Sequence, residues 1–459
     1  MADGKAPGML NRSALLAAFA GFLLACVCPM HSLTLSPTVL HRVQQPTPAT
    51  PLQTGQATPV AHPLLERAQA AMESKDFARA VEWLEQFLAT HPDHVPARFN
   101  LAYSYAELKR YADARKNYGE VLKRDPGLHQ ANLNLGLILL AQQDFSSAVA
   151  PFEKVVASNP AEARGRYLLA FALEKSGKLA EAAEHYRAGS REDPKNLDFH
   201  LSLGRVAYEL KDFNKAESEF RAAQALREDS AEARLGLGET LLAQNQLAAA
   251  AIEFDRYLSL KPEDGDARLR LAGLYLDLIQ PEKALETLPA ASADQQASPT
   301  WKETAARSYA MLKRWPEAVR LYQDLALARP NDAATFAALG EALLKARQFQ
   351  AAAGVLERTL RMEPSPQVGS EARRNLVSAH YLAADYPAAL AALDSLAALE
   401  PLPAILFFVR ASCYDHLRQT KAAIDSYRKF LALADGNHPD QEFQARHRLI
   451  ALERELRRR

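Results

Sequence analysis

The sequence predicts an all-α protein built as a solenoid of about eleven similar helix pairs. Three observations support this. An alanine recurs every 34 residues through most of the chain, the residues around it recur with it, and the composition favours helices. Glycine accounts for only 19 of the 459 residues, whereas alanine and leucine are abundant. A period of about 20–50 residues is typical of repeat proteins whose units contact only their neighbours.

The recurring alanine sets the register, and the residues around it predict two packed helices in each unit. Twelve residues before the alanine lies a small residue in every unit but one, and four residues after it lies a large apolar residue. Small residues let a partner helix approach closely, and the large side chain then fills the space between the helices. The alanines are Ala80, Ala114, Ala148, Ala182, Ala216, Ala250, Ala284, Ala318, Ala352, Ala389 and Ala423.

The ends of the units predict how the units assemble. Eight of the eleven close on a proline, as at Pro126 and Pro160, and proline cannot continue a helix. Each helix pair leaves one apolar face bare, which only the next pair can cover. We expect nine units in residues 61–366, two more in residues 370–437, and a capping helix in residues 438–459.

Some features depart from this regular pattern. Pro151 and Pro289 fall inside expected second helices, where an interior proline costs about 3 kcal/mol and kinks or ends the helix. An insertion at residues 367–369 lies in the sequence PSPQVGS, for which we expect a longer surface loop. The capping helix carries apolar residues at helical spacing: Phe443, Ile450, Leu452 and Leu456.

The units resemble the tetratricopeptide repeat. They share its 34-residue period, the pair Leu135-Gly136 with Leu139 three residues later, the alanine and aromatic residue of the second helix, and the closing proline. The resemblance covers most of the chain. It implies a right-handed superhelix whose concave groove is lined by the first helices, and it says little about the ligand.

By this resemblance, the residues that flank the Leu-Gly pair form the candidate binding groove for a partner protein. Asparagines at the places of Asn100 and Asn134 hold the backbone of bound peptides in several members, since an amide offers both a donor and an acceptor. An alternative stays open, in which the aromatic residues only pack between neighbouring first helices. The candidates are Phe99, Asn100, Tyr103, Leu133, Asn134, Leu137, Tyr167 and Phe171.

Farther along the array, the expected groove becomes polar and carries both signs of charge. Arg205, Glu239, Arg307 and Glu341 are the residues responsible. We expect a different ligand class there, or none. The carboxylate clamp of chaperone-binding members is excluded near the two asparagines, because the basic residues that it requires are lacking there.

The first 60 residues predict the location of the protein. Residues 1–28 place an apolar run after Lys5 and Arg12, as in an export signal or a membrane anchor. The stretch LLAC, which ends at Cys26, is similar to a bacterial lipobox, so Cys26 is a candidate for lipidation. A lipoprotein and an uncleaved anchor rank equally, and a cleaved, free protein ranks third.

Residues 29–60, rich in proline and threonine, predict a disordered linker. We therefore expect an exported protein of the cell envelope, with the array outside the cytoplasm.

The sequence carries no enzymatic motif, since it lacks a phosphate-binding glycine loop, a GxSxG elbow and an HExxH motif. His91 and His94 have no further metal ligand nearby, and Cys413 has no histidine partner, so we expect no metal, cofactor or small-molecule substrate. Zero net charge argues against nucleic acid as a partner.

Two functions fit: a non-enzymatic envelope scaffold that binds peptide or helical segments of other proteins, and a glycan- or peptidoglycan-associated spacer without a protein ligand.

Overall fold

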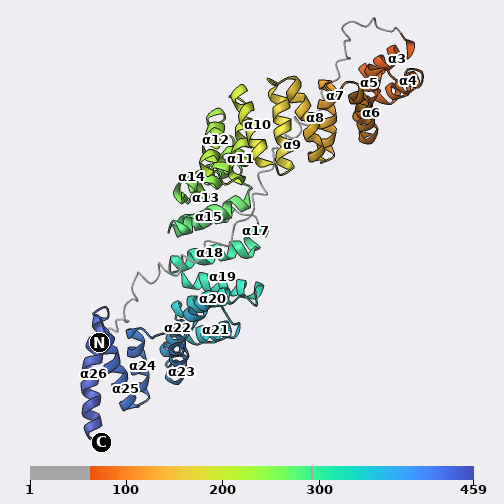
Figure 1. Ribbon diagram of the computed structural model, residues 1–459. Coiled ribbons are helices and arrows are strands. Elements are labelled where there is room, and N and C mark those ends of the chain that lie inside the picture. Colours follow the sequence, from red (N-terminus) through yellow and green to blue (C-terminus); the bar gives the residue numbers. More distant parts are fainter. Residues whose placement is uncertain (1–61, 291–292, 459) are drawn as a thin grey trace. The chain divides into compact units, whose positions relative to one another are not determined.

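The computed structural model describes residues 62–290 and 293–458, and every regular element in this part of the chain is a helix. The helices follow one another as a repeat helical solenoid (Figure 1), which confirms the predicted fold class. The expected signal or anchor, the expected linker and Cys26 lie outside the described residues. No helix in the described part is both long enough and apolar enough to span a membrane.

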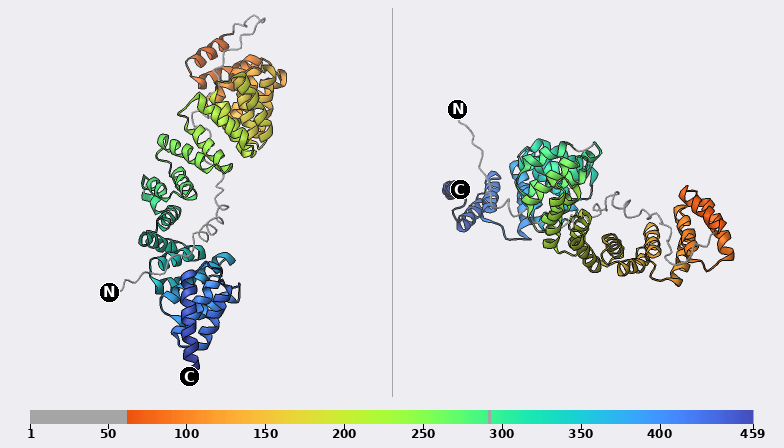
Figure 2. Two further views of the ribbon diagram at one scale, coloured as in Figure 1. Left: turned by 90° about the vertical axis from the view of Figure 1, so that its left-hand side faces the viewer. Right: turned by 90° about the horizontal axis from the view of Figure 1, so that it is seen from above.

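The chain divides into two compact parts, Met1–Asn245 and Gln246–Arg459, which we call the N-terminal part and the C-terminal part. Figure 2 shows the helices of each part from two further sides. In the N-terminal part the helices are α3 (Pro63–Glu73), α4 (Phe77–Thr90), α5 (Val95–Glu107), α6 (Tyr111–Arg124), α7 (His129–Ala141), α8 (Phe145–Ser158), α9 (Ala163–Lys175), α10 (Leu179–Glu192), α11 (Leu197–Glu209), α12 (Phe213–Leu226) and α13 (Ala231–Ala243).

The C-terminal part continues the same alternation and closes with one long helix. Its elements are α14 (Leu247–Leu260), α15 (Gly265–Asp277), α16 (Pro281–Thr287), the 3₁₀ turn η1 (Leu288–Ala290), α17 (Ala293–Ala297), α18 (Pro299–Met311), α19 (Trp315–Ala328), α20 (Ala333–Lys345), α21 (Phe349–Arg361), α22 (Pro366–Leu382), α23 (Tyr386–Ala397), α24 (Ala404–His416), α25 (Thr420–Leu433) and α26 (Pro439–Arg458).

The same kind of tight turn connects the two helices within each pair. Between α3 and α4, the amide of Asp76 donates to the carbonyl of Ala71 at 2.8 Å, as in a Schellman motif. The residue before it, Lys75, adopts a left-handed φ of 61°. The same left-handed place recurs at Lys109, Gln143, Gly177, Lys211, Asn245, Ile279, Lys313, Arg347, Ala384 and Arg418.

The large residue of the second helix fills the space between the two helices, as the sequence predicts. Phe152 is fully buried, and a β-carbon on Gly136 would lie 2.5 Å from its ring. Only a residue without a side chain allows α7 and α8 to approach this closely. Tyr118, Tyr186, Phe220 and Phe254 are likewise at most 1% exposed.

The insertion at residues 367–369 does not form a surface loop, so that expectation is wrong. These residues lie inside α22, which has 17 residues where α20 has 13. Four more residues correspond to about one additional helical turn. Pro366 opens the helix, at a position where its missing N–H costs nothing.

The two interior prolines have different outcomes. The second helix that contains Pro289 ends early, because α16 stops at Thr287 and continues only as a 3₁₀ turn. This matches the predicted effect of proline. By contrast, α8 runs without interruption through Pro151, which is buried, so the helix does not end there.

The capping helix exists, but its buried face differs from the predicted one. Ala445 and Leu452 are at most 1% exposed and join the cluster around Phe430. Phe443 and Ile450 are 63% and 50% exposed. The apolar spacing that included these two residues therefore did not identify the packed face.

Candidate functional site

The candidate site is the side of the array formed by the first helices at fixed places of the repeat, which we call the first-helix face. Counted back from the repeat alanine, these are the −15, −14, −11 and −8 places. In α5 they are occupied by Phe99, Asn100, Tyr103 and Ala106. Residues spaced by three, four and seven lie along one side of a helix, so the four places share one face.

Seven of the eight predicted site residues are buried. Their exposed fractions are 1% for Phe99, 9% for Tyr103, 3% for Leu133, 4% for Asn134, 4% for Leu137, 6% for Tyr167 and 3% for Phe171. Asn100 is half-buried. The N-terminal part of the first-helix face is therefore filled mainly by the protein's own side chains.

The contacts of α5 and α7 show what this filling consists of. The Phe99 ring meets the Tyr118 ring edge to face at 5.5 Å, and the Tyr103 ring meets Phe77 at 5.9 Å. The Asn134 amide donates from Nδ2 to Tyr118 Oη at 3.0 Å. The resemblance predicts that the Asn134 amide binds a ligand. In this structure its Nδ2 instead donates to a tyrosine of the same protein.

Asn100 differs from Asn134 in its surroundings. Its Oδ1 is buried and has no hydrogen-bond partner among the described residues. A buried acceptor that lacks a partner costs free energy, and a ligand donor would remove this cost. Of the eight predicted residues, Asn100 therefore has the clearest unmet polar requirement.

The aromatic residues of α9 belong to a larger aromatic cluster. The Tyr167 ring lies 5.4 Å from the Tyr186 ring and 5.5 Å from the Phe199 ring, both edge to face. Its hydroxyl is hydrogen-bonded to Ser202 Oγ at 3.0 Å. Tyr167 therefore packs among the helices of the array, as in the alternative in which the aromatic residues do not contact a ligand.

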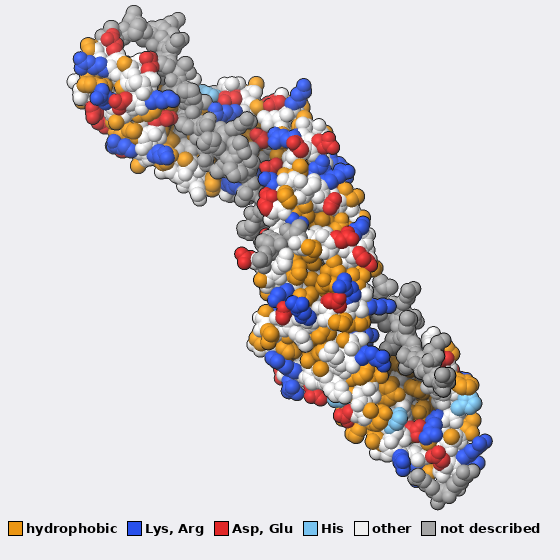
Figure 3. Space-filling model, turned by 180° about the vertical axis from the view of Figure 1, so that it is seen from behind, with side chains coloured by type: hydrophobic (Ala, Val, Ile, Leu, Met, Phe, Trp, Pro, Cys, Tyr) orange, Lys and Arg blue, Asp and Glu red, His pale blue; other side chains and the backbone are white. Residues whose placement is uncertain are grey.

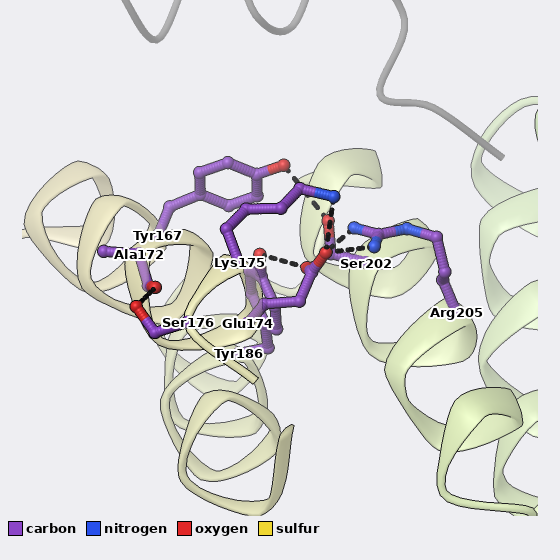
Figure 4. A network of polar contacts seen from close by, with 8 residues as sticks. All are labelled: Tyr167, Ala172, Glu174, Lys175, Ser176, Tyr186, Ser202 and Arg205. Carbon is purple, nitrogen blue, oxygen red and sulfur yellow. Dashed lines mark hydrogen bonds and ion pairs between the residues drawn. The ribbon is translucent and has the colours of Figure 1, made fainter. Parts of the chain in front are cut away.

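A buried ion pair joins α9 to α11 beside this cluster (Figure 4). Arg205 Nη2 donates to Glu174 Oε2 at 2.8 Å, and Nη1 donates to Glu174 Oε1. Tyr186 Oη donates to the same carboxylate at 3.0 Å, and Lys175 Nζ lies 3.2 Å from Glu174 Oε1. The side chains of Glu174 and Arg205 are 3% and 8% exposed.

Each charge of this pair stabilises the other. Burial alone would raise the pKa of Glu174, but the Arg205 guanidinium outweighs burial and holds that pKa below its usual value. Burial would likewise lower the pKa of Arg205, and Glu174 reverses the effect and raises it. Arg205, predicted as part of a mixed-charge groove, is thus already neutralised by its own protein.

The C-terminal part places Arg307 and Glu341 at the −11 place of α18 and α20, without such neutralisation. Neither residue forms an ion pair with any residue that the structure describes. At the −8 place, where α9 has Glu174, α15 has Leu276 and α18 has Ala310. Of the four predicted mixed-charge residues, Arg307 and Glu341 are exposed or half-exposed, whereas Arg205 and Glu239 are buried.

Sequence reasoning missed Glu174, although it lies at a place that the register defines. Glu174 occupies a −8 place, three residues after Phe171, and a comparison of this place across the units would have found it.

The face of the molecule drawn in Figure 3 carries side chains of both charge signs. Figure 3 shows basic and acidic side chains interspersed over the face in view, without a region of one sign. Within residues 62–290 and 293–458, no group of acidic residues, histidines and cysteines has the geometry of a metal site. His94 has a structural role instead, since its Nδ1 accepts the Ala97 amide at 3.1 Å and caps α5.

Models of the tetratricopeptide repeat match the chain over most of the described array. One model matches residues 65–129, 105–163, 133–196, 201–265, 337–401 and 376–438, and another of the same description matches residues 173–225. Together these matches span more than half of the chain.

Curated relatives are distant and differ in length. A protein described as an uncharacterized lipoprotein of Treponema pallidum is 26% identical over 140 residues, which cover 30% of this chain and 71% of the relative. Anaphase-promoting complex subunit 3 of Schizosaccharomyces pombe is 21% identical over 199 residues (43% of this chain, 30% of the relative). Superkiller protein 3 of the same yeast is 26% identical over 242 residues (49% and 17%).

Solved structures of MamA are similar to part of the chain. The MamA RS-1 ArsTM double mutant is 24% identical with a TM-score of 0.34, and the match covers 36% of this chain and 93% of that one. MamA 41-end from Desulfovibrio magneticus RS-1 is 23% identical with a TM-score of 0.34, with coverage of 36% and 94%.

Proposed function

The chain belongs to the tetratricopeptide repeat family, and from this premise we propose that it is a non-enzymatic scaffold whose first-helix face binds peptide or helical segments of partner proteins. Proteins of this family act as protein-interaction scaffolds. The family match is the observation that carries the proposal, since the fold alone does not define a ligand.

The polar groups of the first-helix face support a protein ligand. Asn100 Oδ1 lacks a partner among the described residues, and Glu341 lacks an ion-pair partner there. A peptide segment offers backbone donors and charged side chains for such groups. The buried residues Phe99 and Tyr167 then support the face from below, and Asn100 contacts the ligand.

We further propose that the scaffold is exported and works in the cell envelope. The apolar run within residues 1–28 and the LLAC stretch that ends at Cys26 support this location, as does the similarity to a lipoprotein of Treponema pallidum. Lipidation of Cys26 and an uncleaved anchor are the two attachments that the proposal admits.

Site-specific photocrosslinking in cells tests the scaffold function. A photoreactive residue replaces Ala337, a half-buried residue at the −15 place of α20, in the full chain. The matched control carries it at Gln350, an exposed residue of α21 in the same helix pair. Discrete protein adducts at Ala337 and none at Gln350 support the proposal. Adducts with glycan alone, or equal adducts at both positions, would favour the spacer function instead.

The location is tested separately. Metabolic labelling with a radioactive fatty acid detects lipidation, and Cys26→Ser should abolish the label if Cys26 carries the acyl group. An unlabelled protein that remains in the membrane fraction supports the uncleaved anchor. A protein that is found only in the cytoplasm contradicts the envelope location.

A further inference from the structure

Three histidines surround one phenylalanine ring at the start of the described array, and we call these three residues the histidine cluster. Phe87 of α4 is fully buried, and its ring stacks parallel to the His91 ring with the centroids 4.4 Å apart. The His62 and His94 rings meet it edge to face at 4.9 and 5.1 Å. His62 precedes α3, His91 follows α4 and His94 precedes α5, so the cluster joins the first three helices of Figure 1.

Two of these histidines cap helices, and only the neutral ring can do so. His62 Nδ1 accepts a hydrogen bond from the Leu64 amide at 3.2 Å, at the N-terminus of α3. His94 Nδ1 accepts one from the Ala97 amide at 3.1 Å, at the N-terminus of α5. Such a cap satisfies an amide that the helix itself leaves without a partner. Protonation turns the ring nitrogen into a donor, so the charged ring loses this role.

The third histidine keeps its contacts when it is protonated. His91 Nδ1 lies 3.3 Å from the Phe87 carbonyl oxygen and 2.9 Å from Thr90 Oγ1. A proton on Nδ1 is satisfied there, and a second proton on Nε2 costs no hydrogen bond. The His91 ring lies 5.7 Å from the His62 ring. A charge on His91 therefore opposes a charge on His62, because like charges repel at this distance.

The surroundings of His94 also oppose its protonation. Burial lowers the pKa of His94, and the charge of His91 lowers it further. A lowered histidine pKa contributes stability that is present above the unfolded pKa and is lost as pH falls through the folded pKa. The folded junction thus resists protons that the opened junction would accept.

The carboxylates near the cluster do not offset this effect. Asp93 is paired with Arg124, and Glu85 accepts a hydrogen bond from Tyr105. Glu66 is exposed, where water and salt screen its charge. The charged side chains on the surrounding elements are Glu66 on α3, Glu85 on α4, Asp93 in the following turn, Arg98 on α5 and Arg124 on α6.

α3 depends on the cluster more than its neighbours do. Only Ala68 and Ala71 of α3 are buried, compared with seven residues of α5. A helix with few buried apolar contacts opens locally at a low cost in free energy. The His62 cap and the contact of its ring with Phe87 hold the first turn of α3, and both depend on the neutral ring.

We propose that the histidine cluster is an acid-sensitive latch, which holds α3 against α4 at neutral pH and releases it in mildly acidic solution. Histidine is the side chain that ordinarily gains its charge in this range. Release separates the protonated rings and uncovers Leu84 and Phe87, which are buried in one apolar cluster with Ala68 of α3. The latch goes beyond the scaffold function and does not depend on it.

Hydrogen–deuterium exchange of the full-length chain, followed by mass spectrometry, tests the latch. Protection factors, which correct for the pH dependence of intrinsic exchange, are compared at about pH 7.5 and about pH 5.5, on either side of the ordinary histidine range. We expect the protection of the α3 amides to fall at least about fivefold in acid, as for the loss of a helix cap. The amides of α13 are the internal reference, since its cap is the Ser230 hydroxyl, which does not titrate.

The triple variant His62→Asn, His91→Gln, His94→Asn removes the three titrating rings, and asparagine can still cap both helices. Its α3 should keep its protection in acid. The matched control is His129→Asn, which removes a histidine of α7 outside the cluster and should leave the acid effect unchanged.

Two results would overturn the latch: a wild-type α3 that stays protected in acid, or a triple variant whose α3 loses protection as the wild type does. If the triple variant does not fold, His62→Asn alone replaces it, because this change keeps the α3 cap and removes one ring. It should reduce the acid effect on α3, and an undiminished effect would equally rule out the latch.

Discussion

Gly136 of α7 lies directly against the Phe152 ring of α8, so that a β-carbon there would come within 2.5 Å of the ring. Phe152 is fully buried, so the ring or the backbone would have to shift to admit a β-carbon. We expect Gly136→Ala to destabilise the protein by about 1–3 kcal/mol, because an overpacked core forces side chains and backbone to shift. Thermal unfolding followed by circular dichroism measures this effect.

Gly273 of α15 is the control, because a β-carbon there meets nothing within 4 Å. Gly273→Ala should stabilise its helix by about 0.5–1 kcal/mol, since glycine is the weaker helix former. Equal effects of the two substitutions would show that the Gly136 contact is not a constraint.

Ile279 occupies the left-handed turn position between α15 and α16 with a φ of 58°. This conformation costs an L-residue about 1–2 kcal/mol, and asparagine tolerates it better than β-branched residues. Ile279 is 66% exposed, so its side chain contributes little buried surface. Ile279→Asn should therefore raise the unfolding midpoint in chemical denaturation.

Two positions calibrate this result. Asn245 is the natural equivalent of the proposed variant, and Gly177 occupies the same place with a φ of 81°. Gly177→Ala should destabilise the protein by about 1 kcal/mol, since it introduces the strain that Ile279→Asn removes. If Ile279→Asn is destabilising, the contacts of the isoleucine side chain outweigh the backbone strain of the turn.

The fold could be predicted from the sequence because each repeat places the same residue types at the same places. In each unit a small residue of the first helix, such as Gly136, makes room for a large residue of the second helix. This pairing recurs every 34 residues. The exceptions needed the structure. Pro151 and Pro289 are both interior prolines, but only Pro289 ends its helix. The sequence pattern does not show how well the surrounding residues compensate for the backbone hydrogen bond that each proline removes.

The site was less predictable, because it depends on which polar groups already have partners. Arg205 and Arg307 occupy the same −11 place of the repeat, but Arg205 is paired with Glu174. At the corresponding −8 places near Arg307 the sequence has Leu276 and Ala310 instead, and the Arg307 charge acts on Asp277. Spacing identifies the face on which a side chain lies. It does not show whether a neighbouring unit neutralises that side chain.

The Glu174–Arg205 pair predicts a large effect of single substitutions. Glu174→Gln leaves the Arg205 guanidinium buried without its counter-charge, which should cost about 3–5 kcal/mol. The triple variant Glu174→Leu, Arg205→Met, Tyr186→Phe removes the three buried polar side chains and leaves only Lys175, which is 36% exposed, so it should recover most of the loss. Denaturant titrations of the single and triple variants measure this. If the triple variant is as unstable as the single one, the loss is due to packing.

The same pair gives a pH dependence of known sign. Because Arg205 holds the folded pKa of Glu174 below its unfolded value, the stabilisation is present above the unfolded pKa and is lost as pH falls through the folded pKa. The stability difference between the wild-type chain and Glu174→Gln should therefore be largest at neutral pH and shrink in acid. A difference that does not change with pH would show that the charge of Glu174 is not involved.

Glu341 predicts the opposite sign. Its folded pKa is raised because the surrounding protein displaces water from the carboxylate. A raised carboxyl pKa contributes stability that is present below the unfolded pKa and is lost as pH rises through the folded pKa. At neutral pH the charged form therefore costs stability, and Glu341→Gln should raise the unfolding midpoint. The gain should vanish in acid, where the carboxyl is protonated.

Glu317→Gln separates this effect from the general loss of a carboxylate. The hydrogen bond from Arg314 lowers the pKa of Glu317, so its removal should leave stability at neutral pH unchanged or slightly reduced. Thermal unfolding of both variants across a pH series decides between the signs. A Glu341→Gln variant that is less stable at neutral pH would mean that Glu341 already has a stabilising partner within its own protein.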